Sequence, residues 1–487
     1  MAEVGREHAR GFGPELRRMR EEQGISLRAL ARRVVYSAGW LSKVENGVAP
    51  PTPKLAELCD TELGAKGELA ALARCRKPEA GALAMPAQLP RGAAPFVGRV
   101  NELRELNRCL ADAQQTNSGM TVVVDGAPGA GKSTLVTQWA HANAHHFGDG
   151  ILFRDLRGFS GTGPPLVPAE VLEGFLGALG VPSASVPYGT EARAALFRTL
   201  VAGRRVLVVL DNAAGSHQVG PLLPGSPSCG VVVTSRRQMT GTAAHAGARR
   251  LFLGPMSMRE SVDLFACVLG SDRVRAEPEA VRSLAVRCAR LPLALRIAAE
   301  RLAFSRHRSI AGLAGELDGL DDPEGKLDLL ADGDVMTVRI AFEASYRWLD
   351  AESSRAFRLL ALTWGRTVSS ATAAALFGRP AGIARRLLEG LVSLNLLQEV
   401  GRDQYRLDRL LLLYASARAA AEEERTDREA ARQRLDAHSR RVFEGGGKPP
   451  VRHVHAEPAN CSPATAERAA GVLVPGSAPE GNDLQDA

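Results

Sequence analysis

The spacing of apolar residues changes twice along the chain and divides it into three parts. Between residues 13 and 74 apolar positions recur at helical spacing, most clearly at Ile25, Leu27, Leu30, Ala31 and Val34. From 119 to 240, apolar runs such as "TVVVD" and "RVLVVLD" alternate with helical stretches, which predicts a parallel sheet with crossover helices. Beyond Pro255 the helical spacing returns. The pattern therefore predicts a multidomain protein: an all-α domain, an α/β domain and a helical region.

Capping residues indicate where the helices of the first part begin and end. Ser26 and Ser37 stand where helix N-caps are expected, Gly24 and Gly47 follow helical runs, and Pro53 opens a further helix. These signals predict a compact helical domain over residues 10–75. The stretch 76–94 is rich in Ala, Pro and Gly without a period, so we expect a linker there.

The later boundaries come from the same reasoning. We expect an α/β domain over 95–254, a helical subdomain over 255–334 and a winged-helix subdomain over 335–425, with a hairpin around Gly401. The Gly-, Pro- and Ala-rich segment 440–487 is expected to be a disordered tail. We find no internal repeat of about 20 to 50 residues.

Composition excludes several classes. Of 487 residues, 45% are apolar and 24% charged, which are ordinary globular values. No apolar run approaches the roughly 18 residues of a membrane span, and the N-terminus has no signal-peptide core, so we expect a cytoplasmic protein without membrane contact. The seven cysteines lack metal-site spacing and are expected to be reduced. The net charge of +7 is diluted, so an argument for DNA must rest on where charges lie.

The segment "GAPGAGKST" carries the clearest chemistry. It fits the phosphate-loop pattern G-x-x-x-x-G-K-[ST] between a β-like run and a helical one. In such a loop, backbone N–H groups face the phosphates, Lys132 neutralises them and the Ser133 hydroxyl ligates Mg²⁺. The residues expected to hold the nucleotide are Gly126, Pro128, Gly129, Ala130, Gly131, Lys132, Ser133 and Thr134.

Two further strand ends supply companions for the loop. Asp211 follows "RVLVVL" at the expected carboxyl edge of the sheet, where a carboxylate holds Mg²⁺ together with Ser133. Its neighbour Asn212 cannot act as a general base, so any ATP hydrolysis should be slow. Arg236, after "GVVVTS", is placed to reach the γ-phosphate; the alternative is that Arg236 and Arg237 are simply solvated.

The order of "FVGR", "GAPGAGKST", "VLVVLDNA", "VVVTSRR" and "RLPLAL" resembles the NB-ARC nucleotide-binding module of STAND signalling ATPases, over residues 95 to about 415. The resemblance implies an ADP/ATP switch in which Val97 lies near the adenine and Pro292 packs against it. From the residues alone, Pro292 is a kink or a helix start. Where the family carries a His-Asp pair that holds the ADP-bound form, this chain has Asp408 and Arg409. That departure puts the family's lock in doubt, and Asp408 on a solvated helix face is an equal reading.

The N-terminal stretch resembles a helix-turn-helix of the lambda repressor and Cro type, called XRE, in "LARRVVYSAGWLSKVENG". A helix entering the major groove needs short or hydrogen-bonding side chains at its N-terminal end. The expected DNA-binding residues are Arg28, Arg32, Arg33, Ser37, Ala38, Gly39, Trp40 and Lys43, with the arginines at phosphates. For Trp40, a core or rim position is as good a reading as a base contact. The alternative is a helical protein-interaction bundle.

Together the parts resemble the antibiotic-pathway transcriptional regulators of filamentous actinobacteria. That implies double-stranded DNA as a partner, an unknown signal or protein ligand, and self-association in the ATP state. One alternative is a slow signalling ATPase whose N-terminal domain docks a protein. The other is a metabolite kinase, which ranks last because no acceptor-binding lid follows the phosphate loop.

Overall fold

The structure is a computed structural model of the whole chain. It describes residues 12–46, 51, 53–75, 85–92, 95–159, 163–239, 241, 247–305, 307–320, 322–332 and 336–444. Most of the expected tail, from 445 onward, and part of the expected linker lie outside these residues. Within the described helices, none has both the length and the apolar character needed to cross a bilayer.

The N-terminal unit is all-helical, as predicted, and packs around its own apolar core. Its helices are α1 (Phe12–Glu22), α2 (Leu27–Arg33), α3 (Ala38–Glu45), α4 (Pro53–Glu62) and α5 (Glu68–Cys75). The predicted caps are present: Ser26 accepts a hydrogen bond from the Ala29 amide, and Ser37 accepts one from the Trp40 amide. These two caps fix where α2 and α3 begin, and so set the turn between them.

A five-stranded parallel sheet forms the second unit, with the strand order β2-β3-β4-β1-β5. Its strands are β1 (Met120–Gly126), β2 (Ile151–Asp155), β3 (Leu207–Ala213), β4 (Gly230–Ser235) and β5 (Arg249–Leu253). The first four follow the predicted apolar runs. The fifth was not predicted, because β5 opens with two arginines and is largely exposed at the sheet edge.

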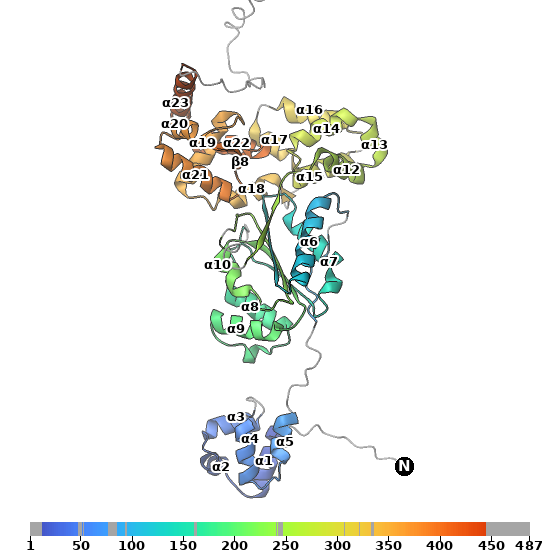
Figure 1. The fold of residues 1–487 in the computed structure, drawn as a ribbon, viewed down its shortest axis with the longest axis vertical. Helices are drawn as coiled ribbons and strands as arrows, with labels where there is room; N and C mark the ends of the chain where they lie inside the picture. The colour runs from blue at the N-terminus through green and yellow to red at the C-terminus, as the bar shows by residue number, and fades with distance from the viewer. Residues whose placement is uncertain are drawn as a thin grey trace, which may run out of the picture.

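Helices cover both faces of this sheet (Figure 1). On one side lie α6 (Val100–Gln115) and α7 (Lys132–Ala142); on the other lie α8 (Pro168–Ala178), α9 (Thr190–Val201) and α10 (Ser216–Val219). Alternate strand residues feed the two apolar cores, with Val122 and Val124 in one and Val123 in the other. This two-sided burial explains why the strands read as continuous apolar runs.

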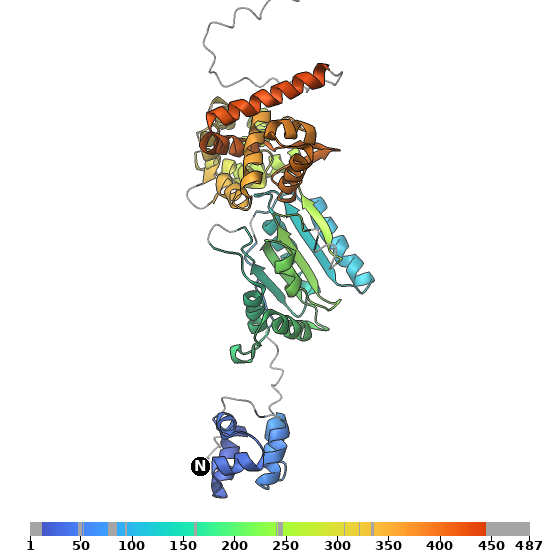
Figure 2. The ribbon, with the colours of Figure 1, turned by 90° about the vertical axis from the view of Figure 1, so that its left-hand side faces the viewer.

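The helical region lies at one end of the sheet (Figure 2). It begins with α12 (Met258–Leu269), α13 (Ser271–Ala276), α14 (Pro278–Arg287), α15 (Pro292–Phe304), α16 (Ile310–Gly319) and α17 (Pro323–Asp328). A small strand pair, β6 (Ala331–Asp332) with β7 (Met336–Thr337), precedes α18 (Val338–Tyr346), α19 (Ala351–Leu360), α20 (Ser370–Phe377) and α21 (Ala381–Ser393). The chain continues through β8 (Gln398–Gly401), β9 (Gln404–Arg406), α22 (Arg409–Glu422) and α23 (Arg425–Glu444).

The antiparallel pair β8–β9 confirms the predicted hairpin around Gly401. Of the expected linker, residues 85–92 are described, and they follow the free edge of β2. The Ile151 amide donates to the Pro86 carbonyl at 2.6 Å, and the Gln88 amide donates to the Ile151 carbonyl at 3.2 Å. This segment therefore covers an exposed strand edge.

Candidate functional site

The loop between β1 and α7 has the conformation that a phosphate cradle requires. Gly126, Gly129 and Gly131 all have positive φ, at 158°, 79° and 87°. A Cβ on Gly129 would lie 3.0 Å from that of Leu293, and one on Gly126 would overlap the Leu253 carbonyl oxygen. Only glycine fits these positions, because side chains here would meet both strain and contact. Of the other expected loop residues, Pro128 and Ala130 are buried and Thr134 is half-buried.

Lys132 begins α7 and turns back over the loop. Its Nζ donates to the carbonyls of Gly126 and Ala127, each at 2.9 Å. Burial lowers the pKa of Lys132 to about 7, helped by the nearby charge of Arg236. The Lys132 amine is therefore held at the centre of the loop, where an anionic ligand would favour its charged form.

Ser133 and Asp211 come together as predicted from the strand ends. The Ser133 hydroxyl donates to Asp211 Oδ1 at 2.7 Å, and Thr234 Oγ1 donates to the same oxygen at 2.5 Å. Burial raises the pKa of Asp211, and these hydrogen bonds oppose that shift. A hydroxyl beside a carboxylate at the carboxyl edge of the sheet is a donor set that suits Mg²⁺.

Asn212 is used in local structure. It has a left-handed φ of 55°, and its side-chain oxygen accepts a hydrogen bond from the Phe159 amide at 3.3 Å. Its Nδ2 lies 3.4 Å from Asp155 Oδ1. The residue next to Asp211 thus joins β3 to the end of β2 and offers no carboxylate.

The "RLPL" segment packs directly on the loop. The Leu293 amide donates to the Gly129 carbonyl at 3.2 Å, and a Cβ on Gly131 would lie 3.8 Å from Pro292. Pro292 is the first residue of α15, which agrees with its reading as a helix start. Just before it, Ala289 and Arg290 both have left-handed φ, at 51° and 52°. Two such residues in succession are uncommon outside functional or tightly constrained segments.

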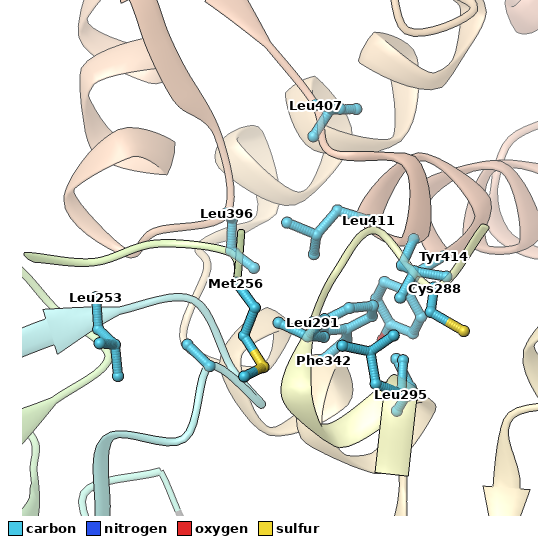
Figure 3. Packing of buried hydrophobic residues seen from close by; sticks show 14 of the residues in the cluster. Leu253, Met256, Cys288, Leu291, Leu295, Phe342, Leu396, Leu407, Leu411 and Tyr414 are labelled. Atoms are coloured by element: carbon cyan, nitrogen blue, oxygen red, sulfur yellow. The ribbon is translucent and has the colours of Figure 1, made fainter. Parts of the chain in front are cut away.

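Apolar side chains from both sides of this contact form one core (Figure 3). In that view Leu291 and Leu295, with Cys288, face Phe342 and Tyr414 of the later helices. A pocket at the edge of this core is lined by Ala127, Ala130, Phe252, Leu253, Gly254, Pro255, Ala289, Leu291, Phe342, Gln398, Asp408, Leu410 and Leu411. It joins the phosphate loop, the end of β5, the helical subdomain and the start of α22. Val97 is half-buried on the segment before α6 and is not among these lining residues.

The position of Asp408 differs from one of the two interpretations of the sequence, which placed it on a solvated helix face. It lies half-buried in this pocket and not on a solvated helix face, and Gln398 Nε2 donates to its Oδ2 at 2.7 Å. Burial raises the pKa of its carboxyl, and the charges of Arg406 and Arg290 oppose that. Arg409, by contrast, is exposed and lies 3.6 Å from Asp318. The pocket next to the phosphate loop therefore contains an acidic side chain that accepts a hydrogen bond and carries no positive charge.

Arg236 is turned toward the helical region. Its Nη1 donates to the Ala341 carbonyl at 2.5 Å and lies 3.1 Å from Ser345 Oγ, both on α18. The guanidinium also lies over the Phe159 ring, 5.6 Å from its centroid. Burial lowers the pKa of Arg236 to about 10, and the charge of Asp211 opposes this. The alternative of two solvated arginines therefore holds only for Arg237, which is exposed.

Arg99 is a site residue that sequence reasoning quoted in "FVGR" but did not single out. It is 4% exposed, and its Nη2 donates to the Ala130 carbonyl at 3.1 Å and to the Gly254 carbonyl at 2.7 Å. Glu260 accepts a hydrogen bond from its backbone amide at 2.6 Å. Arg99 thus ties the phosphate loop to the end of β5 and to α12. The sequence showed only an arginine directly after a glycine in "FVGR"; the burial of Arg99 and the positive φ of Gly98 are visible in the structure alone.

The N-terminal unit presents α3 with an exposed N-terminal end. Ser37, Gly39, Trp40 and Lys43 are exposed and Ala38 is half-buried; Arg28, Arg32 and Arg33 on α2 are also exposed. Trp40 is 38% exposed, so it is not a core residue. On the inner side, Arg20 of α1 donates from Nε and Nη2 to the two carboxylate oxygens of Glu45, at 2.7 and 3.0 Å. This buried pair fixes the outward face of α3.

Comparison with known families decides the nature of this unit. Residues 12–73 match the family described as a helix-turn-helix domain. The N-terminal unit is a helix-turn-helix domain. In this chain the helix-turn-helix domain precedes a P-loop module, an order that agrees with the prediction from the sequence.

Two curated relatives match this chain over a long alignment. The chain is 40% identical over 405 residues to the regulatory protein AfsR of Streptomyces griseus, covering 83% of this chain and 40% of the relative. It is 39% identical over 425 residues to AfsR of Streptomyces coelicolor, covering 86% of this chain and 41% of the relative. The chain thus spans about two fifths of the length of the curated relatives that it matches.

Solved structures give weaker matches. A Walker-type ATPase of Pyrococcus abyssi, PABY2304, has a TM-score of 0.47 at 14% identity, over 66% of this chain and 96% of that one. A STAND protein with a tetratricopeptide-repeat sensor from Pyrococcus horikoshii, PH0952, has a TM-score of 0.31 at 15% identity, over 74% and 47%. Both scores lie below 0.5, so the P-loop assignment comes from the loop geometry and the strand order.

Proposed function

We propose that this protein is a DNA-binding transcriptional regulator whose helix-turn-helix domain is controlled by the nucleotide state of its P-loop module. The observation that carries the proposal is the fusion, in one chain, of an exposed α3 with a phosphate loop whose Ser133 and Asp211 are paired. The name of the curated relatives, regulatory protein, supports the same reading.

The nucleotide is ADP or ATP with Mg²⁺. The loop amides and Lys132 hold the phosphates, while Ser133 and Asp211 hold the metal, whose charge offsets that of the phosphates. The geometry supports this fit, because glycines with positive φ leave the cradle open and a hydroxyl lies 2.7 Å from a carboxylate. Asn212 offers no general base, so we expect turnover to be slow and the module to act as a switch.

DNA contacts come from the exposed end of α3. Ser37, Ala38, Gly39, Trp40 and Lys43 meet base edges or the groove rim, while Arg28, Arg32 and Arg33 neutralise phosphates. The exposure of these side chains supports the proposal, as does the N-cap at Ser37, which aims the start of α3 outward. The charge on this face gives affinity that falls with salt.

Control follows from closure of the helical region over the loop. In the ADP state the region stays closed, and ATP favours an open form that associates with further copies after an unidentified signal. Association places two helix-turn-helix domains on adjacent half-sites and raises their effective concentration. The direct contact of "RLPL" with the phosphate loop supports this coupling, because a ligand in the loop must affect how that segment packs.

Nucleotide titration of the purified chain tests the switch. We expect about one ADP or ATP per chain by calorimetry, with binding lost in Lys132→Ala, and hydrolysis well below the roughly 1–10³ s⁻¹ of ordinary enzymes. Turnover within that range would instead favour an ATPase whose turnover is the output of the protein. Equal binding by Lys132→Ala would exclude the loop as the site.

A further inference from the structure

The closed arrangement is held by polar contacts between the sheet and the later helices. The Gln238 amide donates to the Ser393 carbonyl at 2.8 Å, and its side-chain Nε2 donates to the Val392 carbonyl at 3.2 Å. Asn395 Nδ2 donates to the Arg236 carbonyl at 2.9 Å and lies 3.4 Å from Asp125 Oδ1. The ends of β1 and β4 are thus bound to the end of α21.

Asn395 is built into this contact. It is 8% exposed and has a left-handed φ of 52°, a conformation that asparagine tolerates better than most residues. Its neighbour across the interface, Asp125, is fully buried and forms a double hydrogen bond with Arg250, at 2.5 and 2.9 Å. The acceptor that Asn395 meets is therefore held in place by a second side chain.

Arg236 belongs to the same contact. Its guanidinium is bound to the Ala341 carbonyl and to Ser345 on α18, and it covers Phe159. Phe159 in turn packs against Trp348, with ring centroids 5.3 Å apart. The Nη1 group of Arg236 is therefore engaged by α18 in this conformation.

The other charged groups at the phosphate loop also have protein partners in this conformation. Lys132 donates to two loop carbonyls, and Asp211 accepts from Ser133 and Thr234. Asp408, in the adjoining pocket, carries an acceptor bound to Gln398 and offers a phosphate no positive charge. In this conformation the protein itself therefore supplies the hydrogen-bond partners of these charged groups.

We propose that a latch formed by Arg236, Gln238 and Asn395 against α18 and the end of α21 keeps the module closed without bound ADP. If ATP is bound in the loop, its terminal phosphate would compete with Ala341 and Ser345 for the Arg236 guanidinium and so favour opening. Opening by ATP rests on the proposed nucleotide switch, whereas closure by the latch does not. A phosphate oxygen is a stronger partner for a guanidinium than a neutral carbonyl, since both groups are charged. When the Arg236 guanidinium leaves α18, its hydrogen bonds to Ala341 and Ser345 are broken together.

Hydrogen exchange of the full chain tests the latch. The probes are amides of α18 and of residues 236–239, followed in protein freed of nucleotide, with ADP, and with Mg²⁺ and a non-hydrolysable ATP analogue. Asn395→Gly removes the side-chain bonds and keeps the left-handed backbone unstrained, whereas Asn395→Asp places an anion toward Asp125. Asn101→Ala, at an exposed asparagine of α6, is the matched control.

We expect exchange in the wild type to be equally slow with and without ADP. Both Asn395 variants should exchange about tenfold faster at these amides whether or not ADP is present, while their core amides stay protected. The control should match the wild type. Fast exchange in nucleotide-free wild type, slowed by ADP, would overturn the latch and assign closure to the nucleotide. If the ATP analogue leaves exchange at these amides unchanged while the Asn395 variants exchange faster, the latch is supported and the proposed nucleotide switch is not.

Discussion

The buried pair between Arg20 and Glu45 should determine whether the helix-turn-helix domain presents α3 at all. Their side chains are 11% and 6% exposed, and Arg20 also donates to the Ile25 carbonyl at 2.9 Å. Arg20→Ala leaves the Glu45 carboxylate buried without its partner. Removing one member of such a pair costs about 3–5 kcal/mol. A domain of this size has a stability of roughly 3–9 kcal/mol, so the variant should lose most of it.

Arg17 supplies the control within the same helix. It pairs with Glu21 at 2.9 Å, but these side chains are 57% and 53% exposed. Exposed pairs contribute about 0–1 kcal/mol, because water screens them. Arg17→Ala therefore makes the same substitution in α1 without leaving a buried charge behind.

Hydrogen exchange of the α3 amides in the full chain measures the difference. At about 1.4 kcal/mol per factor of ten, Arg20→Ala should accelerate exchange roughly 10²- to 4 × 10³-fold and Arg17→Ala at most about fivefold. A double variant, Arg20→Met with Glu45→Leu, should recover protection, since apolar replacements of a buried pair are often neutral. If Arg20→Ala accelerates exchange by no more than fivefold over wild type, the buried pair does not stabilise α3 to this extent.

Further predictions concern the two sites. Gly126→Ala should abolish ADP binding measured by calorimetry, because its Cβ would overlap the Leu253 carbonyl; unchanged affinity would contradict the loop geometry. ADP binding at pH 8 should take up protons, since the Lys132 pKa of about 7 leaves its amine mostly neutral until a phosphate raises that pKa; titrations in buffers of different ionisation enthalpy would show uptake, and proton release would contradict it. Asp408→His should tighten ADP about tenfold by removing an anion, and weaker binding would count against this pocket. Arg32→Ala should reduce the salt dependence of DNA binding by about one phosphate contact, and an unchanged slope would exclude that contact.

Features fixed by local sequence could be predicted. Ser26 and Ser37 cap their helices, and the phosphate loop lies between a strand and a helix, because capping and backbone freedom depend on neighbouring residues. Asp211 could be placed beside Ser133 because carboxyl ends of parallel strands share one edge. Each inference used a rule that spans only a few residues or a single sheet.

Contacts between distant segments could not be predicted. Asn395 meets Arg236, and Arg250 pairs with Asp125, across gaps that no periodicity in the sequence marks. The strand β5 was missed because an edge strand with exposed arginines lacks the apolar run of a buried one. Asp408 was open to a solvated reading because its pocket is formed by segments far apart in the chain.

DNA binding as a function of bound nucleotide is the decisive measurement for nucleotide control of the helix-turn-helix domain. The full chain would select duplexes from a random pool, and its affinity for a selected duplex would be measured with ADP and with Mg²⁺ and a non-hydrolysable ATP analogue at one salt concentration. We expect tighter binding with the ATP analogue, and the loss of that difference in Lys132→Ala. Equal affinity in both nucleotide states, with nucleotide bound in each, would contradict nucleotide control.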